Sequence, residues 1–248
     1  MGCLVSSRPL YNALVKACWR NRLVDSGMPI LFFFFSVRLE KTELYDSRTK
    51  LRTATRIANP GCYATSMQLL LAPLLPLLDP ARPPTVFGIS GYSGAGTVSH
   101  TDPDGLVHVA PKVPATDLLE GIRPYALTDH IHEREAGFRL GVRGMAFVPS
   151  VGGWFSGITS VASVPLAPGR KVSAREIKGL YEAMYKDERM VEMWSTEVLP
   201  KGVAGRHGWV FAGLQVHSAG DRVVVMVRCS AVIGSCCLGL MGFPGWAG

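Results

Sequence analysis

The sequence predicts an α+β domain in which a mostly antiparallel sheet carries its helices on one side. Three observations support this fold class. Short apolar segments typical of strands follow one another with few helical patterns between them, a capping box marks one helix, and a short turn joins the last two strands into a hairpin. A chain of 248 residues with 48% hydrophobic residues is long enough to bury a substantial core.

The first elements follow from hydrophobic periodicity and turn residues. Residues 52–57 are expected to form a short strand, residues 63–78 a buried helix and residues 85–90 the next strand. A polar, glycine-rich loop is expected over residues 91–114, and a short helix over 116–125. Strands over 144–151 and 157–165 are then expected to be joined by a tight turn at Gly152 and Gly153.

The C-terminal half contains the clearest helix signal. Ser173 and Glu176 have the spacing of a capping box, which opens a helix that runs to about residue 186. Strands over 208–217 and 222–228 flank a turn at 218–221. Residues 1–43 and 229–248 show no sustained period and are unassigned, so the predicted catalytic domain spans residues 44–228.

Composition narrows the class of protein. The net charge is +7, but the Lys and Arg residues are scattered, which favours an enzyme with an anionic substrate over a nucleic-acid binder. Six cysteines without paired spacing, and no secretory leader, indicate reduced thiols. The densest apolar run, residues 29–37, is about half as long as a membrane span, so no membrane segment is expected. The N-terminus fits the pattern for myristoylation of Gly2, and no transit peptide is visible.

The strongest chemical signal surrounds Cys62. Asn59 is a suitable N-cap and Pro60 suits the first turn of a helix, so Cys62 is expected in the first turn of the apolar helix that follows. N–H groups and the positive end of the helix dipole there favour the thiolate and form a pocket for an oxyanion. Gly61 lets a substrate approach the backbone. We therefore predict a catalytic nucleophile, against the more common role of a cysteine as a small buried hydrophobe.

Two histidines are candidates for moving protons beside this thiol. His130 and His132 alternate, so in an extended segment they would share one face, with Asp129 and Glu133 available to orient a ring. The H-x-H spacing can also bind zinc, but no partner motif supplies the remaining ligands. We favour an acid/base histidine over a metal ligand, with a solvated charged loop as the remaining alternative.

The glycine-rich segment over residues 88–96 imitates a dinucleotide-binding loop. Such a loop must open an apolar helix, whereas polar residues follow here, so this reading fails. We expect instead a loop on the substrate side, in which backbone N–H groups together with Ser90, Ser93 and Gly94 hold an anionic group. A plain flexible turn is the alternative.

With the thiol, the glycine-rich segment and the two histidines in this order, the chain resembles N-acetyl-gamma-glutamyl-phosphate reductase, an enzyme of arginine biosynthesis. Residues 57–65 correspond to the active-site motif of that family. The resemblance extends over residues 44–227 through the segments 90–96, 129–134, 147–149 and 213–218. The histidine segment is most similar to the fungal, mitochondrial form, which is made as a precursor joined to an acetylglutamate kinase.

The resemblance implies a fold like the C-terminal domain of glyceraldehyde-3-phosphate dehydrogenase and a two-step reaction. The Cys62 thiolate would attack an acyl phosphate, release phosphate and leave a thioester, which NADPH would reduce to the semialdehyde. His130 or His132 would shuttle the proton, with His132 preferred, and Asn59, Gly61, Ser90, Ser93 and Gly94 would contact the substrate. The family further implies NADP as cofactor, no metal, a homo-oligomer and the mitochondrial matrix.

The sequence also departs from the family. Members begin with a dinucleotide-binding domain, whereas residues 1–43 contain no glycine-rich loop between a strand and a helix, and residues 229–248 do not match. We therefore expect an incomplete copy from which the main NADP-binding domain is missing. Two alternatives stay open: a cysteine hydrolase that uses Cys62 with His132, and a non-catalytic domain that assembles with full-length subunits.

Overall fold

The structure is a computed structural model that describes residues 31–32, 57–58, 61–95, 97–104, 107–111, 113–119, 121–188, 190–194 and 208–229. The chain divides into two compact units, residues 1–60 and 61–248. In the first unit, strands β1 (Leu31–Phe32) and β2 (Ile57–Ala58) pair in parallel. Several predictions lie outside the described residues. They concern the domain limit at residue 43, the N-terminal myristoylation pattern and the tail after residue 229. Most of residues 1–43, where we expect no dinucleotide-binding domain, also lie outside them.

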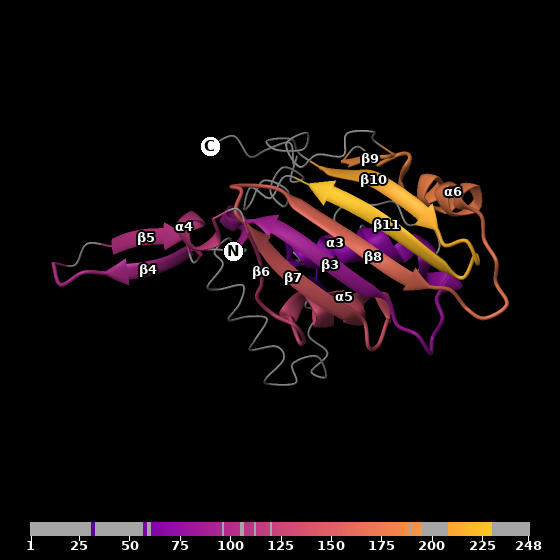
Figure 1. The fold of residues 1–248 in the computed structure, drawn as a ribbon, viewed down its shortest axis with the longest axis horizontal. Helices are drawn as coiled ribbons and strands as arrows, with labels where there is room; N and C mark the ends of the chain where they lie inside the picture. Colours follow the sequence, from indigo (N-terminus) through magenta and orange to yellow (C-terminus); the bar gives the residue numbers. More distant parts are fainter. Residues whose placement is uncertain are drawn as a thin grey trace. The chain divides into compact units, whose positions relative to one another are not determined.

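A seven-stranded sheet forms the centre of the second unit (Figure 1). Its strands lie in the order β6 (Ile122–Pro124), β7 (Ala146–Gly152), β3 (Thr85–Gly91), β8 (Ile158–Pro165), β11 (Arg222–Cys229), β10 (Trp209–Val216) and β9 (Val191–Glu192). All neighbours are antiparallel except the pairs β3–β7 and β9–β10. The predicted mostly antiparallel sheet is therefore confirmed.

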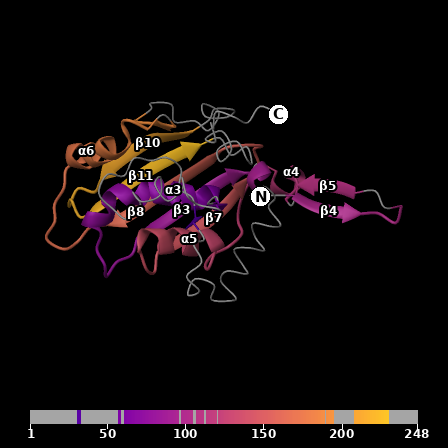
Figure 2. The same cartoon turned by 180° about the vertical axis from the view of Figure 1, so that it is seen from behind.

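Helices cover one face of this sheet, as predicted. Helices α3 (Cys62–Leu71) and α5 (Ile131–Leu140) lie behind the sheet in Figure 1 and in front of it in Figure 2. Helix α3 packs on β8, β11 and α5, and α6 (Ala174–Tyr185) packs on β10. Every residue of α3 after Cys62 is buried, so this helix forms the middle of the hydrophobic core.

Prolines end α3 earlier than the predicted helix over 63–78. The 3-10 helix η3 (Ala72–Leu77) follows directly, because Pro73 has no N–H to donate to the carbonyls of the preceding turn. Two buried tyrosines of α6 supply the missing donors: the Tyr181 hydroxyl donates to the carbonyl of Leu70, and the Tyr185 hydroxyl donates to that of Leu69 at 2.9 Å. Helix α6 therefore holds the C-terminal end of α3.

Two elements that carry local sequence signals are confirmed. The Ser173 hydroxyl accepts a hydrogen bond from the N–H of Glu176 at 3.1 Å and caps α6, which ends at Tyr185. Strands β10 and β11 form the expected antiparallel hairpin around residues 217–221. Strand β3 also lies where the sequence predicts it.

The predicted tight turn between the strands at 144–151 and 157–165 is wrong, although both strands exist as β7 and β8. Strand β3 lies between them, parallel to β7 and antiparallel to β8. The connection over residues 153–157 must therefore cross the end of β3, a span of two strand spacings or about 10 Å. A Cβ on Gly91 would lie 2.6 Å from the backbone of Phe155, so the crossing requires glycine at the end of β3.

Two further predictions need correction. The segment 91–114, expected to be a loop, contains a 3-10 helix, η4 (Tyr92–Ala95), and the separate antiparallel pair β4 (Thr97–Thr101) and β5 (Val107–Pro111). The helix predicted over 116–125 is only the short α4 (Ala115–Leu118), because Leu119 adopts a left-handed φ of 49°. Residues 122–124 then pair with β7 as the edge strand β6.

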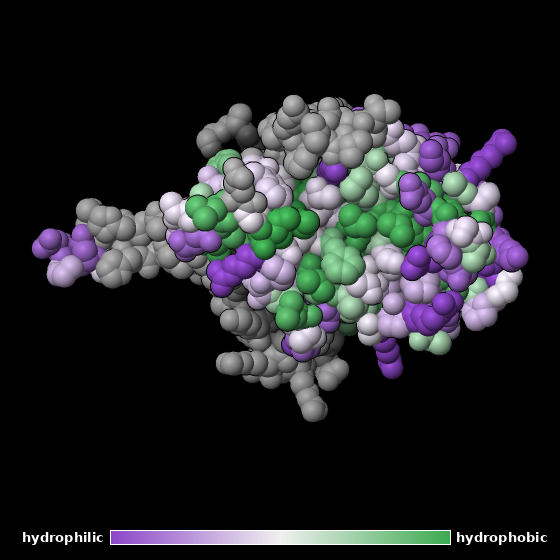
Figure 3. Space-filling view, viewed as in Figure 1, coloured by the Kyte–Doolittle hydropathy of each residue, from purple (hydrophilic) through white to green (hydrophobic). Residues whose placement is uncertain are grey.

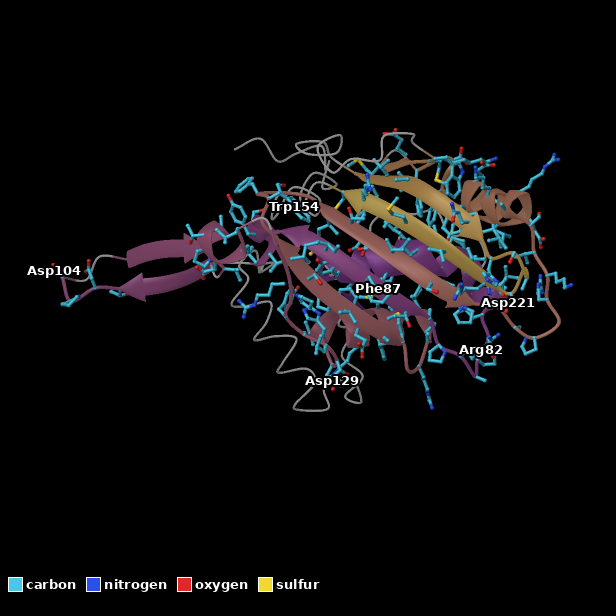
Figure 4. The ribbon with its side chains drawn as sticks, in the orientation of Figure 1. Arg82, Phe87, Asp104, Asp129, Trp154 and Asp221 are labelled. Atoms are coloured by element: carbon cyan, nitrogen blue, oxygen red, sulfur yellow. The ribbon has the colours of Figure 1, made fainter. Side chains whose placement is uncertain are left out.

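The other face of the sheet carries an apolar row that no described helix covers. Val148, Phe87, Val161 and Met226 are register partners across β7, β3, β8 and β11. Phe87 is 51% exposed and the other three are partly exposed. Figure 3 shows hydrophobic residues over this face, and Figure 4 shows Phe87 near its middle. We call these four residues the open-face row.

Candidate active site

The candidate nucleophile stands at the start of α3. Cys62 is the first residue of the helix and is partly exposed, whereas Tyr63 and Ala64 behind it are buried. The carbonyl of Gly61 accepts hydrogen bonds from the N–H and the hydroxyl of Thr65, at 2.9 and 3.0 Å. The predicted placement of Cys62 in a first helical turn is confirmed, so its thiol lies at the positive end of the helix dipole.

The cap of this helix differs from the prediction. Gly61 rather than Asn59 is the N-cap residue, with φ −66° and ψ 160°, and no side chain from its own turn caps the helix. Asn59 and Pro60 lie outside the described residues. The N–H of Gly61 donates instead to the carboxyl oxygen Oε1 of Glu135 on α5 at 3.3 Å. This N–H is therefore already used and is not part of a free oxyanion pocket.

The two histidines open α5 instead of lying in an extended segment. Asp129 takes a left-handed φ of 58°, and His130 is then the N-cap residue, whose Nδ1 accepts a hydrogen bond from the N–H of His132 at 3.2 Å. Burial lowers the pKa of His130 below its usual 6.5. Since a protonated Nδ1 could not accept this bond, both effects favour the neutral ring.

His132 lies against the turn that carries the thiol. Its ring occupies the space beside Gly61 in which a side chain would stand, because a Cβ built on Gly61 would lie 2.6 Å from both Cδ2 and Cε1 of His132. The His130 ring also packs against the His132 ring, with 4.8 Å between ring centroids. Of the two histidines, His132 is the one whose ring meets the residue before Cys62.

Aromatic rings also pack around the starts of α3 and α5, a region that we call the thiol–imidazole corner. Tyr63 packs its ring edge-on against Phe147 at 5.0 Å between centroids, and its hydroxyl donates to the carbonyl of Ser150 at 3.1 Å. Burial raises the pKa of Tyr63 well above its usual value, and the nearby Ser90 side chain partly offsets this rise. The predicted site residue Ser90 is itself buried, so the structure places it beneath the corner, next to Tyr63.

Three amides of the glycine-rich segment are used within the fold. The N–H groups of Gly91, Tyr92 and Ser93 donate to the carbonyls of Gly157, Trp154 and Phe155 at 2.9–3.0 Å. They hold the connection that crosses β3, where Figure 4 labels Trp154. Ser93 and Gly94 lie in η4, and a Cβ on Gly94 would approach the Ser90 hydroxyl at 3.0 Å. Contacts of Ser90, Ser93 and Gly94 with a substrate stay predictions.

The glycine-rich segment does not have the layout of a dinucleotide-binding motif. The amides of Gly91, Tyr92 and Ser93 are used within the fold, and β4 follows η4 where a dinucleotide-binding motif would have a helix. Within the part of the chain that the structure describes, no group of three or more His, Cys, Asp and Glu side chains could hold a metal ion. None of its helices is long and apolar enough to cross a bilayer.

The sheet layer and the thiol–imidazole corner define a domain of the kind found in semialdehyde dehydrogenases. Residues 62–230 match the family described as semialdehyde dehydrogenase, dimerisation domain, and the chain belongs to this family. Among solved structures, aspartate semialdehyde dehydrogenase II from Vibrio cholerae has a similar fold, with a TM-score of 0.53 and 13% identity over 74% of this chain and 59% of that one.

Sequence relatives narrow the class further. The chain is 39% identical to "Protein arg11, mitochondrial" of Schizosaccharomyces pombe over 89% of its own length, and 42% identical to N-acetyl-gamma-glutamyl-phosphate reductase of Xanthomonas oryzae pv. oryzae over 69%. It spans 23% of the length of the first relative and 49% of the second. The resemblance inferred from the active-site motif is therefore confirmed.

Sequence reasoning missed Glu135. The structure brings Gly61, Cys62, His130 and His132 together where α3 and α5 begin, and Glu135 joins them as the hydrogen-bond partner of Gly61. Glu135 stands three residues after His132, so the two share a face only if the segment is helical. The extended conformation assumed for residues 129–134 hid this relation.

Proposed function

We propose that this chain takes part in the reduction of N-acetylglutamyl 5-phosphate to N-acetylglutamate 5-semialdehyde, with release of phosphate and with NADPH as the reductant, in arginine biosynthesis. One observation carries the proposal: a partly exposed cysteine opens a buried helix, and the ring of His132 packs on the residue directly before it. The names of the relatives support the choice of substrate.

The chain's own residues can perform the acyl-transfer half of this reaction. His132 accepts the proton of the Cys62 thiol, and the thiolate attacks the carbonyl carbon of the acyl phosphate. The carbon–sulfur bond forms, the bond from that carbon to the phosphate oxygen breaks, and phosphate leaves with the electron pair. An acyl thioester on Cys62 remains. The helix dipole of α3 stabilises the thiolate before the attack.

His130 has a different role in this proposal. Its Nδ1 already accepts the N–H of His132, so His130 fixes the start of α5 and the position of the His132 ring. We therefore assign proton transfer to His132 and capping to His130. No step that involves the nicotinamide is assigned to the described residues.

We also propose that the open-face row pairs two subunits. The family is named for dimerisation, and the row places four apolar side chains in line on a sheet face that no described helix covers. Burial of such a row against a second copy would remove apolar surface from water.

The mitochondrial names of the fungal relatives support the same compartment for this chain.

A single-turnover experiment tests the proposed chemistry. The full chain is mixed with N-acetylglutamyl phosphate without NADPH, and released phosphate and the mass of the Cys62 peptide are followed. We expect one phosphate per chain and an acyl adduct on Cys62, no adduct in Cys62→Ser, and a rate at least about 100-fold lower in His132→Gln. Absence of both phosphate release and adduct would refute the proposal, and continuous release without NADPH would indicate the hydrolase.

A further inference from the structure

We propose that Glu135 is a positioning residue that fixes the turn before Cys62 and sets the electrostatic environment in which the thiol ionises. This inference rests on the proposed role of Cys62 as the nucleophile. It concerns a buried carboxyl group to which neither the proposed acyl transfer nor the capping of α5 gives a role.

Two side chains of α5 hold Gly61 at the start of α3. Helix α3 has no side-chain cap from its own turn, and the partner of the Gly61 N–H is the Glu135 carboxyl group, from a residue 74 positions further along the chain. On the side where a Cβ would stand, the His132 ring fills the space. Two residues one turn apart on α5 therefore hold Gly61 from two directions, by a hydrogen bond and by contact.

The burial of Glu135 is the second argument. Glu135 is only 9% exposed, and a buried carboxylate is costly unless polar partners compensate for the lost water. If the start of α3 were exposed to solvent, a water molecule could accept the hydrogen bond of the Gly61 N–H and no carboxylate would be needed. The carboxyl group instead stands at the N-terminal end of α3, where a negative charge interacts favourably with the helix dipole.

The charge has a consequence for the thiol. A negative charge near a thiol and an imidazole stabilises the protonated form of each, so Glu135 raises the pH at which Cys62 ionises and extends the range over which His132 stays protonated. Other ionisable side chains near the starts of α3 and α5 are His130 on α5, Tyr63 on α3, Tyr125 after β6 and Cys229 on β11. Arg139 lies near the other end of α5.

The pH dependence of thiol labelling tests the inference. Iodoacetamide labelling of Cys62 in the full chain is followed between about pH 5 and pH 9 by peptide mass spectrometry. In Glu135→Gln the amide oxygen can still accept the Gly61 N–H, so only the charge is lost. We expect the midpoint of labelling to move down by about one pH unit, because the loss of a nearby negative charge makes the thiolate easier to form, with little change in Tm. Glu135→Asp, which keeps the charge, should restore most of the midpoint.

A matched control comes from the same helix. The Glu133 carboxyl group also accepts a backbone N–H, that of Phe147 at 3.0 Å, but it ties α5 to β7 and not to the thiol turn. Glu133→Gln should leave the midpoint unchanged. A folded Glu135→Gln with the wild-type midpoint, or an equal shift in Glu133→Gln, would overturn the inference. If wild-type Cys62 is labelled no faster than Cys229, the proposed nucleophile itself fails, and the inference fails with it.

Discussion

Replacement of Gly61 by alanine isolates the contact between the thiol turn and His132. The backbone of Gly61, with φ −66° and ψ 160°, is open to any residue, so Gly61→Ala introduces no backbone strain. The added methyl group would lie 2.6 Å from two carbons of the His132 ring, whereas ordinary contact begins near 3.4 Å. The ring must therefore move by roughly 1 Å.

The expected size of the effect follows from two opposing terms. Overpacking of this kind lowers the free energy of unfolding by about 1–3 kcal/mol. The lower conformational entropy of the unfolded alanine variant offsets about 0.4–1 kcal/mol of this loss. We expect a net loss of about 1–2 kcal/mol in the free energy of unfolding in urea. Because a displacement of about 1 Å in a catalytic group can cost about 100-fold, the rate of acyl transfer should fall by that order.

Two further variants make the result specific. Gly179→Ala, in α6 with no atom within 4 Å of the added Cβ, should raise stability by about 0.5–1 kcal/mol and leave the rate unchanged. In the double variant Gly61→Ala/His132→Ala the overlap disappears, so the two substitutions should couple by about 1 kcal/mol or more. Wild-type stability and rate in Gly61→Ala would show that His132 does not lie against this turn.

Three other substitutions test separate parts of the structure. Tyr185→Phe leaves the Leu69 carbonyl without its donor and should cost about 1–3 kcal/mol in urea unfolding, and no loss would contradict the proposed support of α3. Burial lowers the pKa of His130 below 6.5, so its neutral form contributes stability above that pH and the contribution is lost as the pH falls. His130→Asn, a cap that does not titrate, should therefore lose less stability than the wild type between about pH 7 and pH 5, and equal losses would refute this role. Phe87→Asp should weaken self-association in sedimentation experiments without loss of secondary structure, and an unchanged dimer would exclude the open-face row as the interface.

Local signals explain what the sequence could predict. The capping serine of α6 and the turn between β10 and β11 each depend on residues within about five positions of one another. Short-range hydrogen bonds and backbone preferences decide such elements, so their patterns are visible in a single chain.

Long-range strand pairing explains the part of the fold that the sequence could not predict. Nothing near β7 or β8 indicates that β3 inserts between them, because this pairing joins segments about 60 residues apart. The prediction for the histidine segment, residues 129–134, was wrong for another reason. A histidine is an unusual N-cap, so the alternation of His130 and His132 favoured an extended segment and concealed the helical face that His132 shares with Glu135.

The bonds at the two ends of α3 have a consequence for when the thiol becomes reactive. A helix of ten residues is too short to be stable alone in water. Its first turn depends on Glu135, and its last carbonyls depend on tyrosines 111 and 116 residues further along the chain. During synthesis Cys62 therefore emerges long before the groups that would order its helix. The proposed nucleophile would therefore reach its activated form only when α6 has been made and docked, which leaves the nascent chain with an ordinary thiol.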